Sequence, residues 1–336
     1  MTADRLTPAY RVTLGDTVVD TTDEPRASSV VALTVSLDLD ALCDACTLTL
    51  GGDWAALPEV DDEARIELGY AGGDLALVLS GVVASVEQRL TGARVVVHDR
   101  GALLLRTFHD ETYQSRTAGA IVRDLARRAE VTTGTVEDGI DFPAYVVDGR
   151  RSAGQHVRAL ARLCGFETYL QPGGELVFER YVGGKTVHVF EHAEHLVEVE
   201  RGERVPRVAT VEAWGEGTGR AGGQRWAWLT KDFSPSRGTA GSGGTKLLVE
   251  RPALRTAAAA RTVAQVTLNE AASRAVAGTI TGSGREAVKL GDAVRIAGVP
   301  GDDVDGSYQV RGVTHRLDKR RGYVTKVSFR SWEAAS

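Results

Sequence analysis

The chain has 336 residues, of which 43% are hydrophobic and 25% charged, so it has the composition of a globular protein that can bury a large core. Its length predicts two domains, or three small ones. The net charge of −5 excludes a strongly basic nucleic-acid binder, and no run approaches the 18 apolar residues of a membrane span. The N-terminus lacks the apolar core of a signal peptide and the three cysteines make no disulfide framework, so we expect assembly in the cytoplasm.

Residues 8–108 carry short alternating runs that predict β-strands. Val30–Leu37, Cys46–Leu50 and Ala93–His98 are examples, and turn residues separate such runs every 10–12 positions. This spacing is typical of a β-sandwich or a small barrel.

Residues 109–205 change to a helical period and then return to strands. Thr117 and Ser152 are expected to cap two helices, and Gly165 is expected to end the second one in the left-handed conformation. Strand-like runs follow, so this segment is predicted to be an α+β insert.

Residues 206–336 contain a glycine-rich stretch between two strand-like regions. Residues 215–244 hold many glycines and are predicted to form a flexible loop, interrupted by an apolar island with Trp226 and Trp228. An alanine-rich helix is expected over about 255–276, and strands resume after it.

Two parts of the chain resemble each other. Asp62–Glu67 followed by Gly81–Val86 matches Asp292–Ala297 followed by Ser307–Val313, with an acidic turn and an arginine in the first strand of each pair. The pattern is short, so the sequence leaves open whether it reflects duplication or chance.

No set of residues predicts a catalytic, cofactor or metal site. His188, His192 and His195 form the densest group of metal-ligand types, but strand character at residues 185–190 favours a solvated turn over a shared helical face. We therefore expect no metal and no cofactor. Two alternatives stay open: an enzyme with a site at the barrel–insert junction, which would use these histidines or scattered carboxylates, and a general binding module that inserts Trp226 and Trp228 into a partner.

Residues 289–332 resemble the C-terminal pattern of the phage late control D family, and a helix ending before Phe166 resembles an earlier segment of it. The likeness covers essentially the whole chain. The matching positions are Leu163, Gly165, Gly291, Asp292, Val294, Ile296, Gly298, Gly306, Tyr308, Val310, His315, Tyr323 and Thr325.

The family comprises baseplate hub proteins of contractile phage tails and injection systems, including the hub portion of VgrG-type spikes. The resemblance implies a mainly β fold with an α+β insert: a first tube-like β-barrel at 1–108, the insert at 109–205 and a second barrel at 206–336. It also implies a non-enzymatic homotrimer that joins a hexameric inner tube to a trimeric spike and contacts other baseplate proteins, with no nucleic-acid recognition or membrane insertion. Because VgrG-like chains continue into a spike whereas this one ends at Ser336, the spike is expected to be a separate polypeptide.

The charge is distributed unevenly along the chain. Residues 1–100 carry a net −10 and the remainder a net +5. In a trimer, this difference is expected to favour contacts between an acidic first barrel and the basic remainder of another copy.

Overall fold

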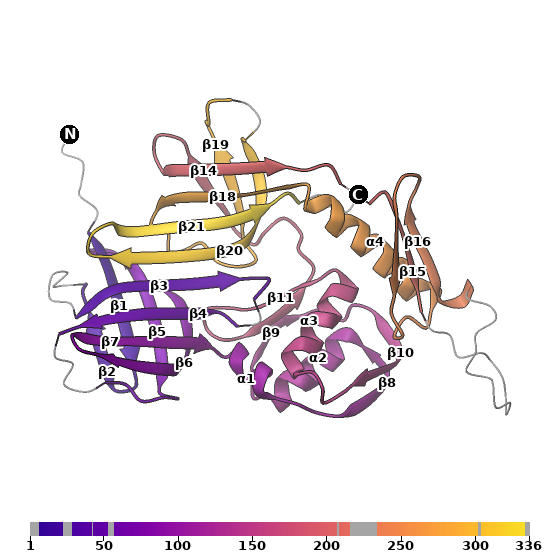
Figure 1. Ribbon diagram of the computed structural model, residues 1–336, viewed down its shortest axis with the longest axis horizontal. Helices are drawn as coiled ribbons and strands as arrows, with labels where there is room; N and C mark the ends of the chain where they lie inside the picture. The colour runs from indigo at the N-terminus through magenta and orange to yellow at the C-terminus, as the bar shows by residue number, and fades with distance from the viewer. Residues whose placement is uncertain are drawn as a thin grey trace.

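The computed structural model describes residues 7–22, 29–41, 43–52, 57–206, 208–215, 234–301 and 304–332. Over these residues the fold is mainly β with smaller α+β parts, which confirms the predicted fold class. Thirteen strands of the described residues form one sheet, which curls into two half-barrels (Figure 1). None of the described helices is both long and apolar enough to cross a bilayer.

The first half-barrel consists of antiparallel strands in the order β3-β4-β7-β6-β5-β1-β2. Alternate side chains point into its core, so that Val35, Leu48 and Ile66 are completely buried. Its strands are β1 (Pro8–Leu14), β2 (Thr17–Asp20), β3 (Val30–Asp38), β4 (Ala45–Gly51), β5 (Glu63–Tyr70), β6 (Ala76–Arg89) and β7 (Gly92–Asp99).

The second half-barrel has the order β14-β18-β21-β20-β19-β13, in which only β13 runs parallel to its neighbour. Ile280, Val294 and Val327 are completely buried in the same hydrophobic cluster that fills the first half-barrel. Its strands are β13 (Val187–Glu191), β14 (Leu196–Glu203), β18 (Val276–Ser283), β19 (Ala293–Ala297), β20 (Gly306–Asp318) and β21 (Gly322–Arg330).

The two half-barrels repeat one arrangement of strands. The order β5-β6-β7-β4-β3 of the first corresponds to β19-β20-β21-β18-β14 of the second. The acidic turns noticed in the sequence occupy equivalent places: Val83 N–H donates to the carbonyl of Asp62 (2.8 Å), and Val310 N–H donates to that of Asp292 (3.1 Å). The sequence likeness therefore coincides with a repeat in the fold.

The half-barrels are joined through one strand of each. The C-terminal half of β20 pairs with β3 antiparallel, from Gly312 opposite Asp38 to Asp318 opposite Ala32. Main-chain hydrogen bonds thus run without interruption from one half-barrel into the other (Figure 1).

The α+β insert packs around its own hydrophobic core. Thr117 caps α2 by accepting from Ala120 N–H, and Ser152 forms a reciprocal capping box with Gln155 at the start of α3, so both predicted helix starts are confirmed. The elements are α1 (Gly101–Arg106), β8 (Glu111–Thr117), α2 (Ala118–Arg128), β9 (Thr133–Val136), β10 (Asp141–Val147), α3 (Ala153–Cys164), β11 (Glu167–Leu170) and β12 (Leu176–Glu179).

The division between the insert and the second half-barrel differs from the predicted boundary at 205/206. Strands β13 and β14, placed in the insert by the sequence, belong to the second half-barrel. The segment after β14 instead contributes Val211, Ala240 and Val263 to the core of the insert. Its elements are β15 (Thr210–Trp214), η1 (Ser234–Ser236), β16 (Arg237–Gly241), β17 (Lys246–Glu250) and α4 (Ala257–Ser273).

The predicted flexible loop at 215–244 is wrong for its C-terminal part, because residues 237–241 form β16. A Cβ atom at Gly238 would lie 2.2 Å from the main-chain nitrogen of Arg261 in α4. Glycine at this position therefore allows a strand and a helix to approach closely. A count of glycines does not distinguish such a packing position from a flexible loop.

Candidate functional site

Several strand edges of the main sheet have no partner strand within the described residues, and two of them belong to strands that correspond to the paired strands β3 and β20. The outer edge of β14 is one of them, because β14 pairs only with β18. Another is the C-terminal half of β6, where pairing with β5 extends only to Val82. Side chains beside these edges are exposed, including Leu90 completely and Val197 by 75%. Unpaired N–H and C=O groups on an edge are a template for pairing with another chain.

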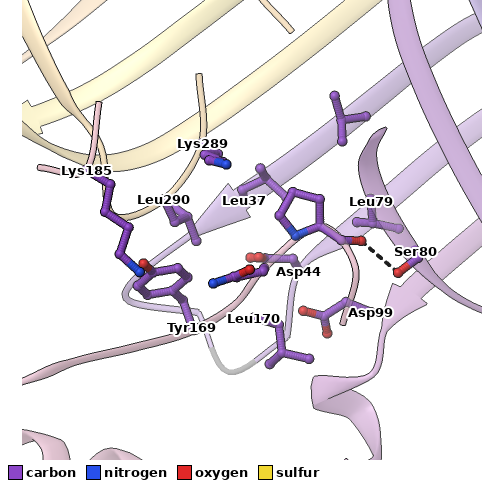
Figure 2. A pocket seen from close by; sticks show the side chains of 13 residues that line it. Leu37, Asp44, Leu79, Ser80, Asp99, Tyr169, Leu170, Lys185, Lys289 and Leu290 are labelled. Carbon is purple, nitrogen blue, oxygen red and sulfur yellow. Dashed lines mark hydrogen bonds between the residues drawn. The ribbon is translucent and has the colours of Figure 1, made fainter. Parts of the chain in front are cut away.

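A small cavity of about 40 Å³ lies where the first half-barrel meets β11 and the loop before β19 (Figure 2). Asp44 and Asp99 are both buried beside it. Asp44 Oδ1 accepts from Asp38 N–H (2.8 Å), and Asp99 Oδ1 accepts from Gly101 N–H (2.9 Å) and from the thiol of Cys43 (3.0 Å).

Burial dominates the electrostatics of this carboxyl pair. It raises the pKa of Asp44 to about 8, with a further contribution from the charge of Asp99, and it also raises the pKa of Asp99 and of the Cys43 thiol. At neutral pH the Asp44 carboxyl therefore holds a proton. The volume suits no more than one or two waters, so the cavity fits a contact between domains better than a substrate site.

A cluster of polar side chains joins the insert to the second half-barrel. Oε1 of Glu167 on β11 accepts hydrogen bonds from Arg311 (2.7 Å), Arg330 (2.9 Å) and Gln309 (2.9 Å). Arg311 also donates to Asp40 at 3.1 Å. We call Glu167, Arg311 and Arg330 the Glu167 cluster; it fixes the position of the insert relative to the sheet.

The resemblance positions in the second half-barrel are buried or lie at its turns. Asp292 is completely buried, its Oδ2 lies 2.9 Å from Nε2 of His188, and its Oδ1 has no hydrogen-bond partner among the described residues. Gly291 and Gly298 have φ of +86° and +71°, and a Cβ at Gly291 would meet the hydroxyl of Tyr169. Val294, Ile296, Tyr308 and Val310 lie in the hydrophobic core, and Gly306 begins β20.

Three further resemblance positions meet inside the second half-barrel. Nδ1 of His315 lies 3.1 Å from Thr325 Oγ1 and 3.0 Å from the hydroxyl of Tyr323, and all three side chains are buried. Burial lowers the pKa of His315 to about 4, so the ring is neutral at pH 7. A buried neutral histidine with two hydroxyls within hydrogen-bond distance of Nδ1 links β20 to β21.

Gly165 and Leu163 lie at the end of α3. Gly165 has φ of +70°, as expected for the left-handed position after a helix, and Leu163 is buried in the insert core.

The three candidate metal-binding histidines are not brought together. His188 pairs with Asp292, whereas His195 Nδ1 accepts from Glu191 N–H in the turn after β13. In the described part of the chain, no group of three or more His, Cys, Asp or Glu residues is arranged to hold a metal. Trp226 and Trp228 lie outside the described residues.

Sequence reasoning missed the Asp44–Asp99 pair and the free edges of β14 and β6. The two aspartates are 55 positions apart and lie beside different strands, so only their three-dimensional pairing brings them together. The free edges depend on which strands pair, although the echo between residues 62–86 and 292–313 was a signal for that pairing.

Solved structures with this fold come from phage tails and a related secretion system. The chain is similar to a 43 kDa tail protein of prophage MuSo2 from Shewanella oneidensis, with a TM-score of 0.72 and 13% identity over 96% of this chain and 98% of that one. It is also similar to a tail protein from Neisseria meningitidis, with a TM-score of 0.71 and 12% identity over 96% of each chain.

A third structure is a type VI secretion component of E. coli, described as similar to the T4 bacteriophage tail proteins gp27 and gp5. It matches with a TM-score of 0.62 and 12% identity over 92% of this chain and 76% of that one. No protein-family model and no curated protein matches the chain. The chain thus has the fold of prophage tail proteins, which confirms the mainly β fold class that the resemblance implies.

Proposed function

We propose that this protein is a structural component of a phage tail or a contractile injection particle, in which it forms the baseplate hub between the inner tube and a spike protein. One observation carries the proposal: two similar half-barrels pair edge to edge through β3 and β20, and the corresponding strands β14 and β6 each keep an edge without a partner strand among the described residues. The likeness in fold to prophage tail proteins supports the class of particle.

A contact between two unlike edges is heterologous, and it repeats from copy to copy until the rotation closes a ring. In a homotrimer, the described fold supplies two half-barrels per chain and six around the axis. Such a ring has nearly sixfold symmetry where the half-barrels face a hexameric tube. The insert occurs once per chain, so it offers a threefold surface to a trimeric spike.

The contacts within the chain suit a protein that transmits axial force. The sheet is continuous across β3 and β20, and the Glu167 cluster and the hydrogen bond from Ser80 Oγ to the carbonyl of Pro172 (2.7 Å, Figure 2) tie the insert to both half-barrels. Force applied to the insert is therefore passed to the ring through several bonds that would have to break together.

Electron microscopy of the intact particle tests the proposal. We expect three copies on the particle axis, between the last ring of the inner tube and the spike. Sedimentation of the purified chain, alone and with the tube and spike proteins, measures the trimer and its partners. A particle whose axis lacks this chain would overturn the proposal.

A further inference from the structure

We infer that β14 of one copy pairs antiparallel with the C-terminal half of β6 of the next copy, in the register that β3 and β20 use within one chain. The inference rests on the proposed function for the presence of neighbouring copies. The register itself is derived from the repeat within this chain.

The position of β6 is given by its correspondence with β20. Both strands shift register opposite their hairpin partner, β6 between Val83 and Ser85 and β20 between Val310 and Gly312. Ser85 therefore corresponds to Gly312, where pairing with β3 begins. Residues 85–89 are the counterpart of a segment that already has an edge partner in the second half-barrel.

The position of β14 follows in the same way from β3. Both strands again shift register, β3 so that Ala32 lies opposite Thr49 of β4, and β14 so that Glu198 lies opposite Thr281 of β18. Glu198 therefore corresponds to Ala32. The free edge of β14 is the counterpart of the β3 edge that pairs with β20.

Transferring the β3–β20 register to these strands gives definite pairs. Arg316 lies opposite Thr34 within the chain, and the equivalent pair between copies is Arg89 with Glu200. The full set is Ser85 with Arg204, Val86 with Glu203, Glu87 with Gly202, Gln88 with Arg201, and Arg89 with Glu200. No pair places two like charges opposite each other, and Arg89 with Glu200 is a cross-strand ion pair.

Groups that the single chain leaves unsatisfied find partners in this register. Arg201 Nε is buried and has no hydrogen-bond partner among the described residues, and the amide oxygen of Gln88 on the opposite strand is an acceptor for it. Arg89 is more than half exposed and reaches only the neighbouring Glu87, at 3.5 Å. Continued past Arg89, the register brings the exposed Leu90 opposite Val199, which packs against the core.

If these two edges pair with each other, they belong to two different copies of the chain. In the order of the sheet, β14 stands at one end, and β18, β21, β20, β3, β4 and β7 lie between it and β6. Figure 1 shows the two strands on opposite sides of the molecule. They cannot pair within one chain, whereas a head-to-tail contact between copies joins them.

Disulfide cross-linking tests the register on the trimer or the intact particle. In the double variant Arg89→Cys/Glu200→Cys, we expect mild oxidation to give covalent dimers and trimers on a non-reducing gel. The matched variant Gln88→Cys/Glu200→Cys places its thiols on opposite faces of the sheet and should react at least about tenfold more slowly. The single variants control for the native Cys43, Cys46 and Cys164.

The outcomes separate this inference from the proposed function. If the chain lies on the particle axis but the 89/200 pair gives no link, or the 88/200 pair links as fast, the register is wrong and the hub function stands. If the chain is absent from the axis, both are overturned.

Charge reversal gives a second measurement. We expect Arg89→Glu and Glu200→Arg each to weaken self-association about fivefold in sedimentation, and the double reversal to restore it. Glu250→Arg changes an exposed glutamate of β17, away from both edges, and should leave self-association unchanged. Failure of the double reversal to recover association would contradict the pairing of these two residues.

Discussion

A Cβ atom at Gly165 would lie 2.6 Å from Cγ2 of Val266, so α4 passes close to the end of α3. Gly165→Ala adds this clash to the strain of a positive φ, and we expect it to lower the free energy of unfolding by about 3 kcal/mol. Denaturant unfolding measures the loss. Gly243→Ala is the control, because Gly243 has a φ of +69° but no atom within 4 Å of the added Cβ. Equal losses in the two variants would show that the approach of α4 contributes nothing.

Asp44 predicts a decrease of stability with rising pH. The pKa of its carboxyl is 3.8 when unfolded and about 8 when folded, so the folded state binds the proton more tightly. Its contribution is fully present below about pH 4 and is lost as the pH rises through 8. Asp44→Asn imitates the protonated form, and we expect it to be more stable than the parent chain at pH 8.5, by on the order of 3 kcal/mol. Thermal unfolding from pH 5 to pH 9 measures this. Asp16→Asn, at an exposed site, should keep the parent's slope of stability against pH. If Asp44→Asn also keeps that slope, the raised pKa of Asp44 is refuted.

We expect removal of the Glu167 charge to lower the free energy of unfolding substantially. Arg311 and Arg330 are each less than a fifth exposed, and Glu167→Gln leaves both guanidinium groups without their shared carboxylate. We expect a loss of about 3 kcal/mol in the free energy of unfolding. Glu270→Gln breaks an exposed helical pair with Arg274 and should cost less than about 0.5 kcal/mol. If Glu167→Gln lowers the free energy of unfolding only slightly, the prediction is wrong, because water then satisfies Arg311 and Arg330 in place of the carboxylate.

His315 predicts a titration far below that of an ordinary histidine. Burial lowers the pKa of its ring to about 4, so the unfolded chain takes up the proton first as the pH falls below 6.5. The stability contribution of His315 is therefore present above pH 6.5 and is lost as the pH falls through 4. Between these values the effect of Asp44 has the opposite sign, so the direct measurement is an NMR titration of the ring, assigned by its absence in His315→Gln. A midpoint near 6.5 would contradict the buried, neutral state.

Much of the fold is predictable because it is encoded locally. Alternating strands predict the β-rich fold, and the caps at Thr117 and Ser152 each depend on residues within three positions. Gly165 was recognisable as a helix end for the same reason. The likeness between the segments at Asp62 and Asp292 was visible because it lies within short stretches, and it coincides with an equivalent main-chain hydrogen bond in each half-barrel.

The rest depends on which segments meet, and no local pattern specifies that. Strand β14 follows β13 without a marked boundary, but its partner β18 lies 72 residues further along. The carboxyls of Asp44 and Asp99 look ordinary in the sequence because their pKa values rise only when the half-barrel and the insert close over them. Gly238 looks like loop glycine until α4 is placed against it.

The separation of β14 from β18 gives the two half-barrels different folding histories. Six residues connect β3 to β4, but 72 connect the equivalent β14 to β18, so closing the second pair costs about 2 kcal/mol more in chain entropy. During synthesis the first half-barrel is complete before β20 leaves the ribosome, and its β3 edge waits for the last strands of the chain. The nascent first half-barrel is therefore the template on which the second is assembled. Until β20 pairs with it, the β3 edge is the surface most at risk of pairing with the wrong chain.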